Sequence, residues 1–317
     1  MYIVTNAQVC KPTPIKNVLS LFDGISCGQL ALRMAGIDYE KYYASEIEDF
    51  SIRVTQNRFP DTVQLGDVQK VRGSDLPSID LLFAGSPCQG LSRCGYQKNF
   101  DDERSKLYYE FLRLLKETNP KYFLLENVCM DAESENIITE DLGVKPYYIN
   151  SAVFCAQQRP RLYWTNLPIK NLPLVASREV VQDILETTTT EIEYSPPSLK
   201  ISDWEYELSH VSSFPYGKFS RKVGHVGNKE AQATKVYSTY SKSVCLLANG
   251  GGQGGKTGLY AIGKNKARKL TPLECERLQM LPDGYTDCVK GSSENRYKAI
   301  GNGWTVGVIS HLLQGIK

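Results

Sequence analysis

The sequence predicts an α/β protein in which a parallel sheet with helices on both faces is interrupted by a smaller inserted domain. Two observations carry this prediction. Over the first half of the chain, short apolar runs typical of buried strands alternate with segments of helical periodicity. Past Pro168 the alternation stops, and a Gly-rich, Tyr-rich region continues until helical patterns return near Leu270. We therefore expect a larger domain of residues 1–185 and 299–317 and a smaller domain of residues 186–298.

The expected elements of the first half follow one another in a regular order. Apolar runs predict strands at residues 17–22, 42–46, 79–84, 121–125, 151–156 and 161–165. Helical patterns lie between them at residues 28–35, 49–58 and 103–118. In sheets of this kind ligands bind beyond the carboxyl ends of the strands. The residues that directly follow each strand are therefore the candidate functional residues.

Linker-like and capping residues mark the second half. Residues 187–190 are four threonines and residues 195–198 are Ser-Pro-Pro-Ser, a composition typical of a break between domains. Thr271, Pro272 and Glu274 occupy the N-cap, first helical and capping-box positions of an expected helix. The pattern of residues 303–314 predicts a last helix, which we expect to pack against the larger domain.

The composition excludes several classes of protein. A chain of 317 residues with 41% hydrophobic and 23% charged residues can bury a sizeable core. No apolar run approaches the roughly 18 residues of a membrane span, and residues 1–16 lack the apolar segment of a secretory signal. Nine cysteines without a CxxC pair favour reduced thiols in a cytosol-like compartment. Three scattered histidines suggest no metal site, so we expect neither a membrane nor a metal as a partner.

Charge is distributed unevenly along the second half. Residues 171–214 contain eight acidic and two basic residues, whereas residues 215–270 contain eleven lysines and arginines and one acid, Glu230. Such a surplus of positive charge suits a polyanionic partner. A solvated basic face explains the same count equally well.

Glycines and acids follow the first two expected strands. Gly24 and Gly28 allow a tight turn and a close approach of the backbone to a ligand at a helix N-terminus. Glu46, about twenty residues further on, is placed to accept both hydroxyls of a ribose. The pair suits a nicotinamide dinucleotide and S-adenosylmethionine equally, and a packing role for the glycines is also open. Asp67 adds a candidate acceptor for an adenine amino group.

A thiol, a carboxyl group and two guanidinium groups follow the later strands. Cys88 stands in a Pro- and Gly-containing turn, where exposure and a lowered pKa can make a nucleophile. Glu126 follows the next strand, and Arg159 and Arg161 follow the one after. Each of them alone has a plain structural or surface interpretation. Together they converge on one edge of one sheet.

With these residues the chain resembles the C5-cytosine DNA methyltransferase family over nearly its whole length. The segments that carry the resemblance occur in the order of the family: FDGISCG at 22–28, SPCQGLS at 86–92, ENV at 126–128, QQRPR at 157–161, RKLTPLECERLQMLPDGY at 268–285 and IGNGWTVGVI at 300–309. The resemblance implies a Rossmann-like S-adenosylmethionine-dependent methyltransferase sheet with a small inserted target-recognition domain. It also implies S-adenosylmethionine as cofactor and double-stranded DNA as partner.

The chain departs from the usual bacterial pattern in one turn. Bacterial members usually have FxGxGG, where this chain has Ser26 and Cys27 in place of the later glycines. This turn and the Gly-Trp-Thr after Asn302 are similar to the animal de novo methyltransferases. The Gly-rich segment 250–260 of the small domain is similar instead to compact bacterial restriction-associated enzymes. We therefore expect a stand-alone, monomeric prokaryotic or phage enzyme that acts in the cytoplasm.

The resemblance assigns a role to each catalytic residue. Cys88 supplies a thiolate that adds to carbon 6 of a cytosine flipped out of the duplex. Glu126 hydrogen-bonds N3 and the exocyclic amine, Arg161 contacts O2 and Arg159 steadies the site. The implied cofactor-binding residues are Phe22, Gly24, Gly28, Glu46, Asp67, Val68, Pro87, Leu107, Asn302 and Trp304. The implied DNA-binding residues are Gln89, Ser92, Arg104, Gln232, Lys235 and Lys256.

Three alternatives remain at this point. Residues 250–257 match the phosphate-binding expression GxxxxGK[ST], which requires a strand before it and a helix after it; residues 243–248 could be the strand, but no helical pattern follows Thr257, which argues against a P-loop. A tRNA cytosine-5 methyltransferase has the same fold and catalytic set, although its usual Cys-Phe-Thr tripeptide is missing here. A non-catalytic DNA-binding paralogue is the third, and such proteins typically lose the Cys or Glu that this chain keeps. A zinc-dependent cytosine deaminase is excluded, because the chain contains neither PCxxC nor HxE.

Overall fold

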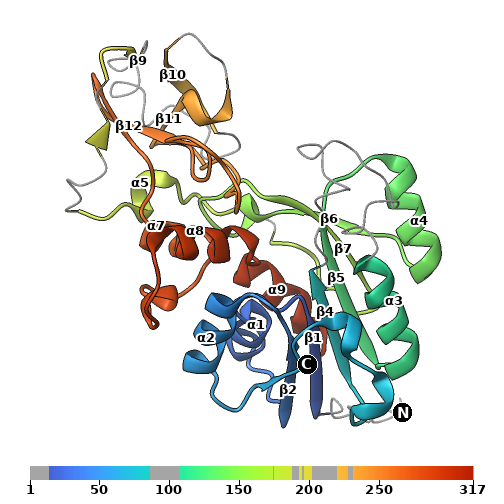
Figure 1. The fold of residues 1–317 in the computed structure, drawn as a ribbon. Coiled ribbons are helices and arrows are strands. Elements are labelled where there is room, and N and C mark those ends of the chain that lie inside the picture. Colours follow the sequence, from blue (N-terminus) through green and yellow to red (C-terminus); the bar gives the residue numbers. More distant parts are fainter. Residues whose placement is uncertain are drawn as a thin grey trace, which may run out of the picture.

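The computed structural model describes residues 14–85, 107–173, 175–187, 193–194, 196–201, 220–227 and 231–316. Five of the expected site residues, Pro87, Cys88, Gln89, Ser92 and Arg104, lie outside these ranges. Figure 1 shows a large region built around one twisted sheet and a smaller region built around a second sheet, with the helices α7 Pro272–Leu278 and α8 Ser293–Asn302 between them.

The large region contains a seven-stranded sheet in the order β3-β2-β1-β4-β5-β7-β6. Its strands are β1 Asn17–Leu21, β2 Lys41–Ser45, β3 Val63–Gln64, β4 Leu81–Gly85, β5 Tyr122–Val128, β6 Tyr147–Asn150 and β7 Pro160–Thr165. The first five in this spatial order are parallel to one another, whereas β7 runs antiparallel to both β5 and β6. The expectation of a parallel sheet is therefore wrong at β7, since an apolar run does not encode strand direction.

Helices cover both faces of this sheet, as the sequence predicts (Figure 1). One apolar cluster joins the sheet to α1 Cys27–Ala35, α2 Asp49–Arg58 and α9 Val306–Leu313. The other cluster joins it to α3 Leu107–Thr118 and α4 Ala132–Leu142. Alternate residues of β1 serve the two clusters, because Val18 belongs to the first and Leu19 to the second.

One expected strand was wrong, and the expected last helix is present but shorter than predicted. The expected strand 151–156 begins instead as the short 3-10 helix Ser151–Val153, and the strand β6 precedes it. The Asn150 side chain accepts a hydrogen bond from the Ala152 amide at 3.1 Å, which caps that turn. The expected last helix, 303–314, is shorter, and α8 Ser293–Asn302 precedes it. The Gly303 amide bonds back to the Ala299 and Ile300 carbonyls and ends α8 there.

The smaller region is a six-stranded sheet in the order β8-β13-β12-β11-β10-β9. Its strands are β8 Glu193–Tyr194, β9 Leu199–Ile201, β10 Lys222–Val226, β11 Lys235–Ser238, β12 Leu259–Gly263 and β13 Lys266–Arg268. β11 and β12 are parallel and the other neighbours antiparallel. Within residues 239–263 the Gly-rich segment leads from turns into a strand and no helix follows it, so the P-loop alternative is wrong.

A third apolar cluster joins the two regions. It contains residues of α5 Val181–Ile184, α7 Pro272–Leu278 and α8 together with Tyr237 and Tyr260 of the small sheet. The capping box predicted at the start of α7 is confirmed, because Thr271 and Glu274 exchange both of its hydrogen bonds. The domain boundaries proposed from the sequence stay a prediction. In the part of the chain that the structure describes, no helix has the length and apolarity needed to cross a membrane.

Candidate active site

A cavity of about 430 Å³ lies at the carboxyl ends of β1, β2, β4 and β5. The loops after these strands form one side of it, and the end of α8 forms another. Of the described residues expected to bind the cofactor, all but one line this cavity: Phe22, Gly24, Glu46, Asp67, Val68, Leu107, Asn302 and Trp304. The exception is Gly28, where an added Cβ would stand 2.7 Å from Tyr42 Oη and 3.0 Å from Phe83 Cδ2. Its missing side chain therefore permits close packing of α1 on the sheet.

The turn after β1 has an unusual backbone. Phe22, Gly24 and Ser26 have φ values of 57°, 59° and 55°, in the left-handed region that glycine favours. Ser26 stands at a glycine position of the FxGxGG pattern, and its hydroxyl donates to Asp23 Oδ2 and accepts from Gln29 Nε2. These hydrogen bonds hold Ser26 in a conformation that a side chain normally disfavours. Ser26 thus adopts a backbone conformation that glycine favours.

Glu46 at the end of β2 connects this turn to the next loop. One of its carboxylate oxygens accepts from the Gly24 amide at 2.7 Å. The other accepts from the amides of Ile47 and Glu48 at 2.7 and 2.8 Å. Three backbone donors therefore fix the carboxylate on the wall of the cavity, in a defined orientation.

Asp23 lines the same cavity and was not among the residues expected to act there. Burial raises the pKa of its carboxyl group to about 6, and hydrogen bonds from Ser26 and Tyr42 partly oppose the rise. The signal in the sequence was its place between Phe22 and Gly24, directly after a buried strand. Asp67, by contrast, was expected here, and its Oδ1 accepts from the Gln69 amide at 3.0 Å.

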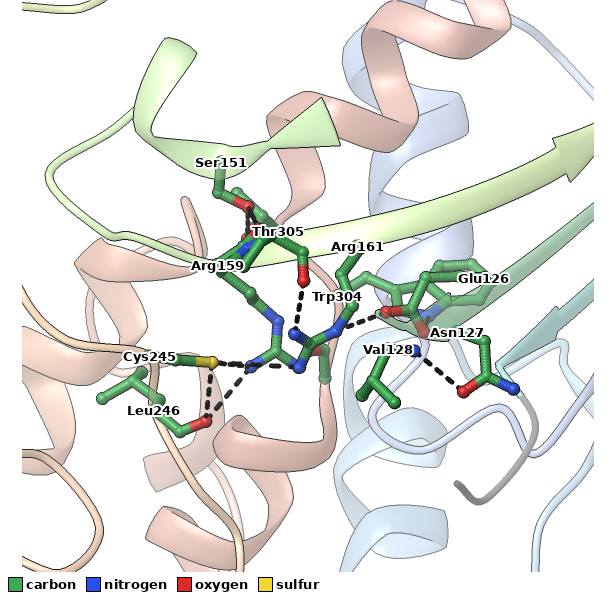
Figure 2. Close-up of polar contacts among 12 residues, drawn as sticks. Glu126, Asn127, Val128, Ser151, Arg159, Arg161, Cys245, Leu246, Trp304 and Thr305 are labelled. Atoms are coloured by element: carbon green, nitrogen blue, oxygen red, sulfur yellow. Dashed lines mark hydrogen bonds and ion pairs between the residues drawn. The ribbon is translucent and has the colours of Figure 1, made fainter. Parts of the chain in front are cut away.

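Glu126, Arg161 and Trp304 meet at the end of the cavity nearest β5 (Figure 2). Glu126 is 8% exposed. Its Oε1 lies 2.7 Å from Arg161 Nε, and its Oε2 accepts from the Trp304 indole Nε1 at 3.1 Å. A buried carboxylate with a guanidinium partner and a second donor is a strongly oriented acceptor.

Arg159 lies behind this group and spans two segments of the chain (Figure 2). It is 4% exposed. Its Nη1 donates to the Leu246 carbonyl at 3.2 Å, and its Nη2 donates to the carbonyls of Gly301 and Gly303 at 3.1 and 2.9 Å. Arg159 therefore ties the segment before the Gly-rich loop to the end of α8, which forms the cavity wall.

Cys245 is a further residue of this group that the sequence did not indicate (Figure 2). Its sulfur accepts from Arg159 Nη1 at 3.5 Å and from Arg161 Nη2 at 3.9 Å. Burial opposes ionisation of the thiol, but the two guanidinium groups outweigh it and lower the pKa of Cys245.

The two arginines reach the site by a route other than the expected one. They stand at the amino end of β7 and just before it, not after a parallel strand. Because β7 is antiparallel to β5, its amino end lies at the same sheet edge as the carboxyl end of β5. Cys88 lies outside the described residues. Gly85, three residues before it in the sequence, is the register partner of Glu126 on the neighbouring strand.

The expected DNA-binding residues of the small region are partly described. Lys235 begins β11 and pairs in register with His225, and Gln232 begins the short helix Gln232–Thr234. Lys256 forms an ion pair with Glu294 of α8. Two further basic residues of this region are buried rather than exposed: Lys242 donates to three carbonyls and Arg268 pairs with Glu274. The basic surface is therefore smaller than the charge count suggests.

An ion pair at the rim of the cavity was also not expected. Lys298 Nζ of α8 lies 2.9 Å from Glu48 Oε1, and both residues line the cavity. No sequence signal links these two positions, which are 250 residues apart. Among the described residues no group of three or more His, Cys, Asp or Glu side chains could hold a metal ion.

Comparisons with known proteins match nearly the whole chain. A model of the C-5 cytosine-specific DNA methylase family matches residues 16–317. The type II methyltransferase M.HhaI of Haemophilus parahaemolyticus is 30% identical over 94% of this chain and 93% of its own length. The type II methyltransferase M1.ScrFI of Lactococcus lactis subsp. cremoris is 27% identical over 92% and 75%. The solved structure of the Entamoeba histolytica methyltransferase EhMeth has a similar fold, with a TM-score of 0.71, 18% identity, and coverage of 96% of this chain and 98% of that one.

Proposed function

The chain belongs to the C-5 cytosine-specific DNA methylase family and is a DNA (cytosine-5-)-methyltransferase, and we propose that the cavity binds its cofactor while Glu126 and Arg161 bind the target base beside Cys88. The observation that carries this proposal is the buried carboxylate of Glu126, held from both sides at the edge of the cavity. We further propose that the enzyme acts as a monomer on double-stranded DNA, in the cytoplasm of a prokaryotic cell.

The residues of the cavity fit S-adenosylmethionine. Its volume of about 430 Å³ lies in the range of small-molecule sites. Phe22, Val68 and Leu107 supply an apolar lining for an adenine, and Glu46 supplies an oriented acceptor for ribose hydroxyls. The charged Glu48, Lys298 and Asp23 at the wall suit the polar amino acid portion. When bound, S-adenosylmethionine supplies an electrophilic methyl group to carbon 5 of the base.

The protein's own residues make carbon 5 reactive. The Cys88 thiolate adds to carbon 6 of cytosine, which converts the ring into an enamine that is nucleophilic at carbon 5. Glu126 accepts hydrogen bonds from the protonated N3 and the exocyclic amine, and Arg161, already paired with Glu126, approaches O2. These groups stabilise the charge that develops on the ring during the addition. Loss of the carbon-5 proton and β-elimination then release the Cys88 thiolate.

The target atom must leave the base stack before this chemistry can occur. Flipping a base costs a few kcal/mol, and protein side chains on both sides of the duplex must offset that cost. We assign the DNA contacts to Gln89, Ser92 and Arg104 after β4, and to Gln232, Lys235 and Lys256 of the small region. Lys256 has a carboxylate partner, Glu294, which a DNA phosphate would have to replace.

The test is a methylation profile at base resolution. Purified protein is incubated with S-adenosylmethionine and unmethylated genomic DNA, and methylated cytosines are mapped by a conversion method. We expect methylation within one short sequence, and we expect Cys88→Ser to abolish it while retaining the wild-type melting temperature. Wild-type turnover in Cys88→Ser would refute the covalent mechanism. If the wild type leaves all DNA unmethylated but methylates tRNA, the chain is a tRNA methyltransferase of the same fold. If it methylates neither while binding duplex DNA, it is a binding protein.

A further inference from the structure

We propose that Trp304 is a positioning residue for Glu126: its indole N–H fixes the plane of the carboxylate that receives the base, while its ring forms part of the cofactor cavity. This inference rests on the proposed function and deepens it. Trp304 was expected as a lining residue of the cofactor site. The structure adds a direct hydrogen bond from its Nε1 to Glu126 Oε2, at 3.1 Å, between residues 178 positions apart (Figure 2).

The carboxylate of Glu126 needs a second donor to have one orientation. Arg161 Nε holds Oε1 at 2.7 Å. A carboxylate held at one oxygen can still rotate, because the terminal torsion of glutamate has a broad energy profile. The indole N–H on Oε2 removes that freedom. With both oxygens fixed, their remaining lone pairs point in defined directions, as accepting hydrogen bonds from a protonated N3 and from the exocyclic amine requires.

The position of the indole is itself strongly determined. The ring packs edge-on against Phe83, with ring centres 5.8 Å apart and planes at 87°. A Cβ on Gly85 would stand 2.8 Å from Trp304 Nε1, so the glycine at the end of β4 makes room for the indole. Gly85 and Glu126 are register partners. Gly85, which leaves space for the indole, and Glu126, which accepts its hydrogen bond, therefore occupy paired positions on the neighbouring strands β4 and β5.

The backbone on either side of Trp304 is also anchored. The Gly303 carbonyl accepts from Arg159 Nη2 and from Gln279 Nε2, both at 2.9 Å. The Thr305 hydroxyl donates to Gln279 Oε1 and accepts from the Ser151 hydroxyl, both at 2.8 Å. These bonds leave the indole little freedom to follow Glu126, so Glu126 must take its orientation from Trp304 and Arg161.

The first part of the test replaces the donor and keeps an aromatic ring. In Trp304→Phe we expect kcat to fall about ten- to hundredfold, the range for losing a hydrogen bond to a charged group. KM for S-adenosylmethionine should change less than about threefold, because the phenyl ring still lines the cavity. Trp164→Phe is the matched control: Trp164 is buried in the core and donates to Thr139, and this variant should keep the wild-type kcat.

The second part is a double-mutant cycle. Gly85→Ala should displace the indole and lower kcat to a similar extent, whereas in the Trp304→Phe background the same change should have less than a threefold effect. Additive losses would overturn the proposal, because they would mean that the two residues act independently. It would equally be overturned if Trp304→Phe kept kcat within twofold, or if KM rose as much as kcat fell.

The third part detects the contact without using activity. Protein labelled with ¹⁵N-tryptophan has three indole N–H groups. Glu126→Gln should move the Trp304 resonance, identified from its loss in Trp304→Phe, and leave the Trp164 resonance in place. An unmoved Trp304 resonance overturns the proposal. If the resonance moves but the wild type methylates no nucleic acid, the positioning contact stands and the proposed function is what fails.

Discussion

Arg159 provides the sharpest test of how the two regions are held together. Its guanidinium donates to three carbonyls, those of Leu246, Gly301 and Gly303, and it is almost fully buried. Hydrogen bonds from a charged donor contribute roughly 1.5–3 kcal/mol each, and the effects of neighbouring bonds are not additive. We therefore expect Arg159→Ala to lower the free energy of unfolding by about 4 kcal/mol, near the upper end for single substitutions.

The geometry also predicts the outcome of the conservative change. A lysine ammonium is a compact point charge, whereas the planar guanidinium reaches carbonyls on two sides at once. Arg159→Lys can satisfy the Leu246 side or the glycine side, and we expect it to recover about half of the loss. Because Gly301 and Gly303 flank Asn302 at the cavity wall, the dissociation constant of S-adenosylhomocysteine should rise in both variants, and more in Arg159→Ala.

The assay is urea denaturation followed by circular dichroism, together with equilibrium dialysis of the cofactor product. Lys116→Ala on the exposed face of α3 is the control, and we expect it to stay within about 0.5 kcal/mol of the wild type. A stability of Arg159→Ala equal to that of this control would refute the role of Arg159 as a link between the two regions. That role would also be refuted if Arg159→Lys and the wild type were equally stable.

Two further predictions concern the turn after β1 and the helix that follows it. Burial raises the pKa of Asp23 to about 6 from 3.8 in the unfolded chain, so its cost to stability is absent below about pH 4 and complete above about pH 6. Asp23→Asn removes this cost. The difference in melting temperature between the variant and the wild type should therefore grow in favour of the variant from pH 4 to pH 7. In free energy of unfolding this gain is at most about 3 kcal/mol. A pH-independent difference would contradict the assignment. Gly28→Ala should lose about 1–3 kcal/mol of stability, because the added Cβ meets Tyr42 and Phe83. Gly263→Ala is the control, because its added Cβ would lie 3.6 Å from the nearest atom, an ordinary contact distance. Both variants are measured by denaturant unfolding, and equal stability of the two would exclude overpacking at Gly28.

Features that depend on neighbouring residues were predictable from the sequence. The predicted bounds of α1 and α2 and the predicted capping box of α7 agree with the structure to within one residue. The alternation of strands and helices also implies a sheet whose carboxyl edge gathers Phe22, Glu46 and Glu126, and these three residues do line one cavity. Such patterns survive without tertiary context because hydrogen bonding and side-chain direction within a turn or strand are local.

Features that depend on distant partners could not be predicted in this way. The direction of β7 follows from its pairing with β5 and β6, and an apolar run is compatible with either direction. A lysine in a basic stretch is expected to be exposed to solvent. Lys242 is instead buried, and its ammonium group donates hydrogen bonds to three carbonyls from two other segments. The ion pairs Lys256–Glu294 and Lys298–Glu48 likewise join segments far apart in the chain.

The sequence by itself determined that Phe22, Glu46 and Glu126 gather at one edge of the sheet, because each stands at or just after the carboxyl end of a strand in the local pattern. Tertiary packing alone decided how they are held. Trp304 reaches Glu126 because Gly85 leaves space between them, and Arg159 finds its carbonyls because the end of α8 returns beside residues 245–246. A hydrogen bond requires its two atoms within about 3 Å of each other. Separations of that size between remote segments are set by the sum of all packing contacts, which no single stretch of sequence contains.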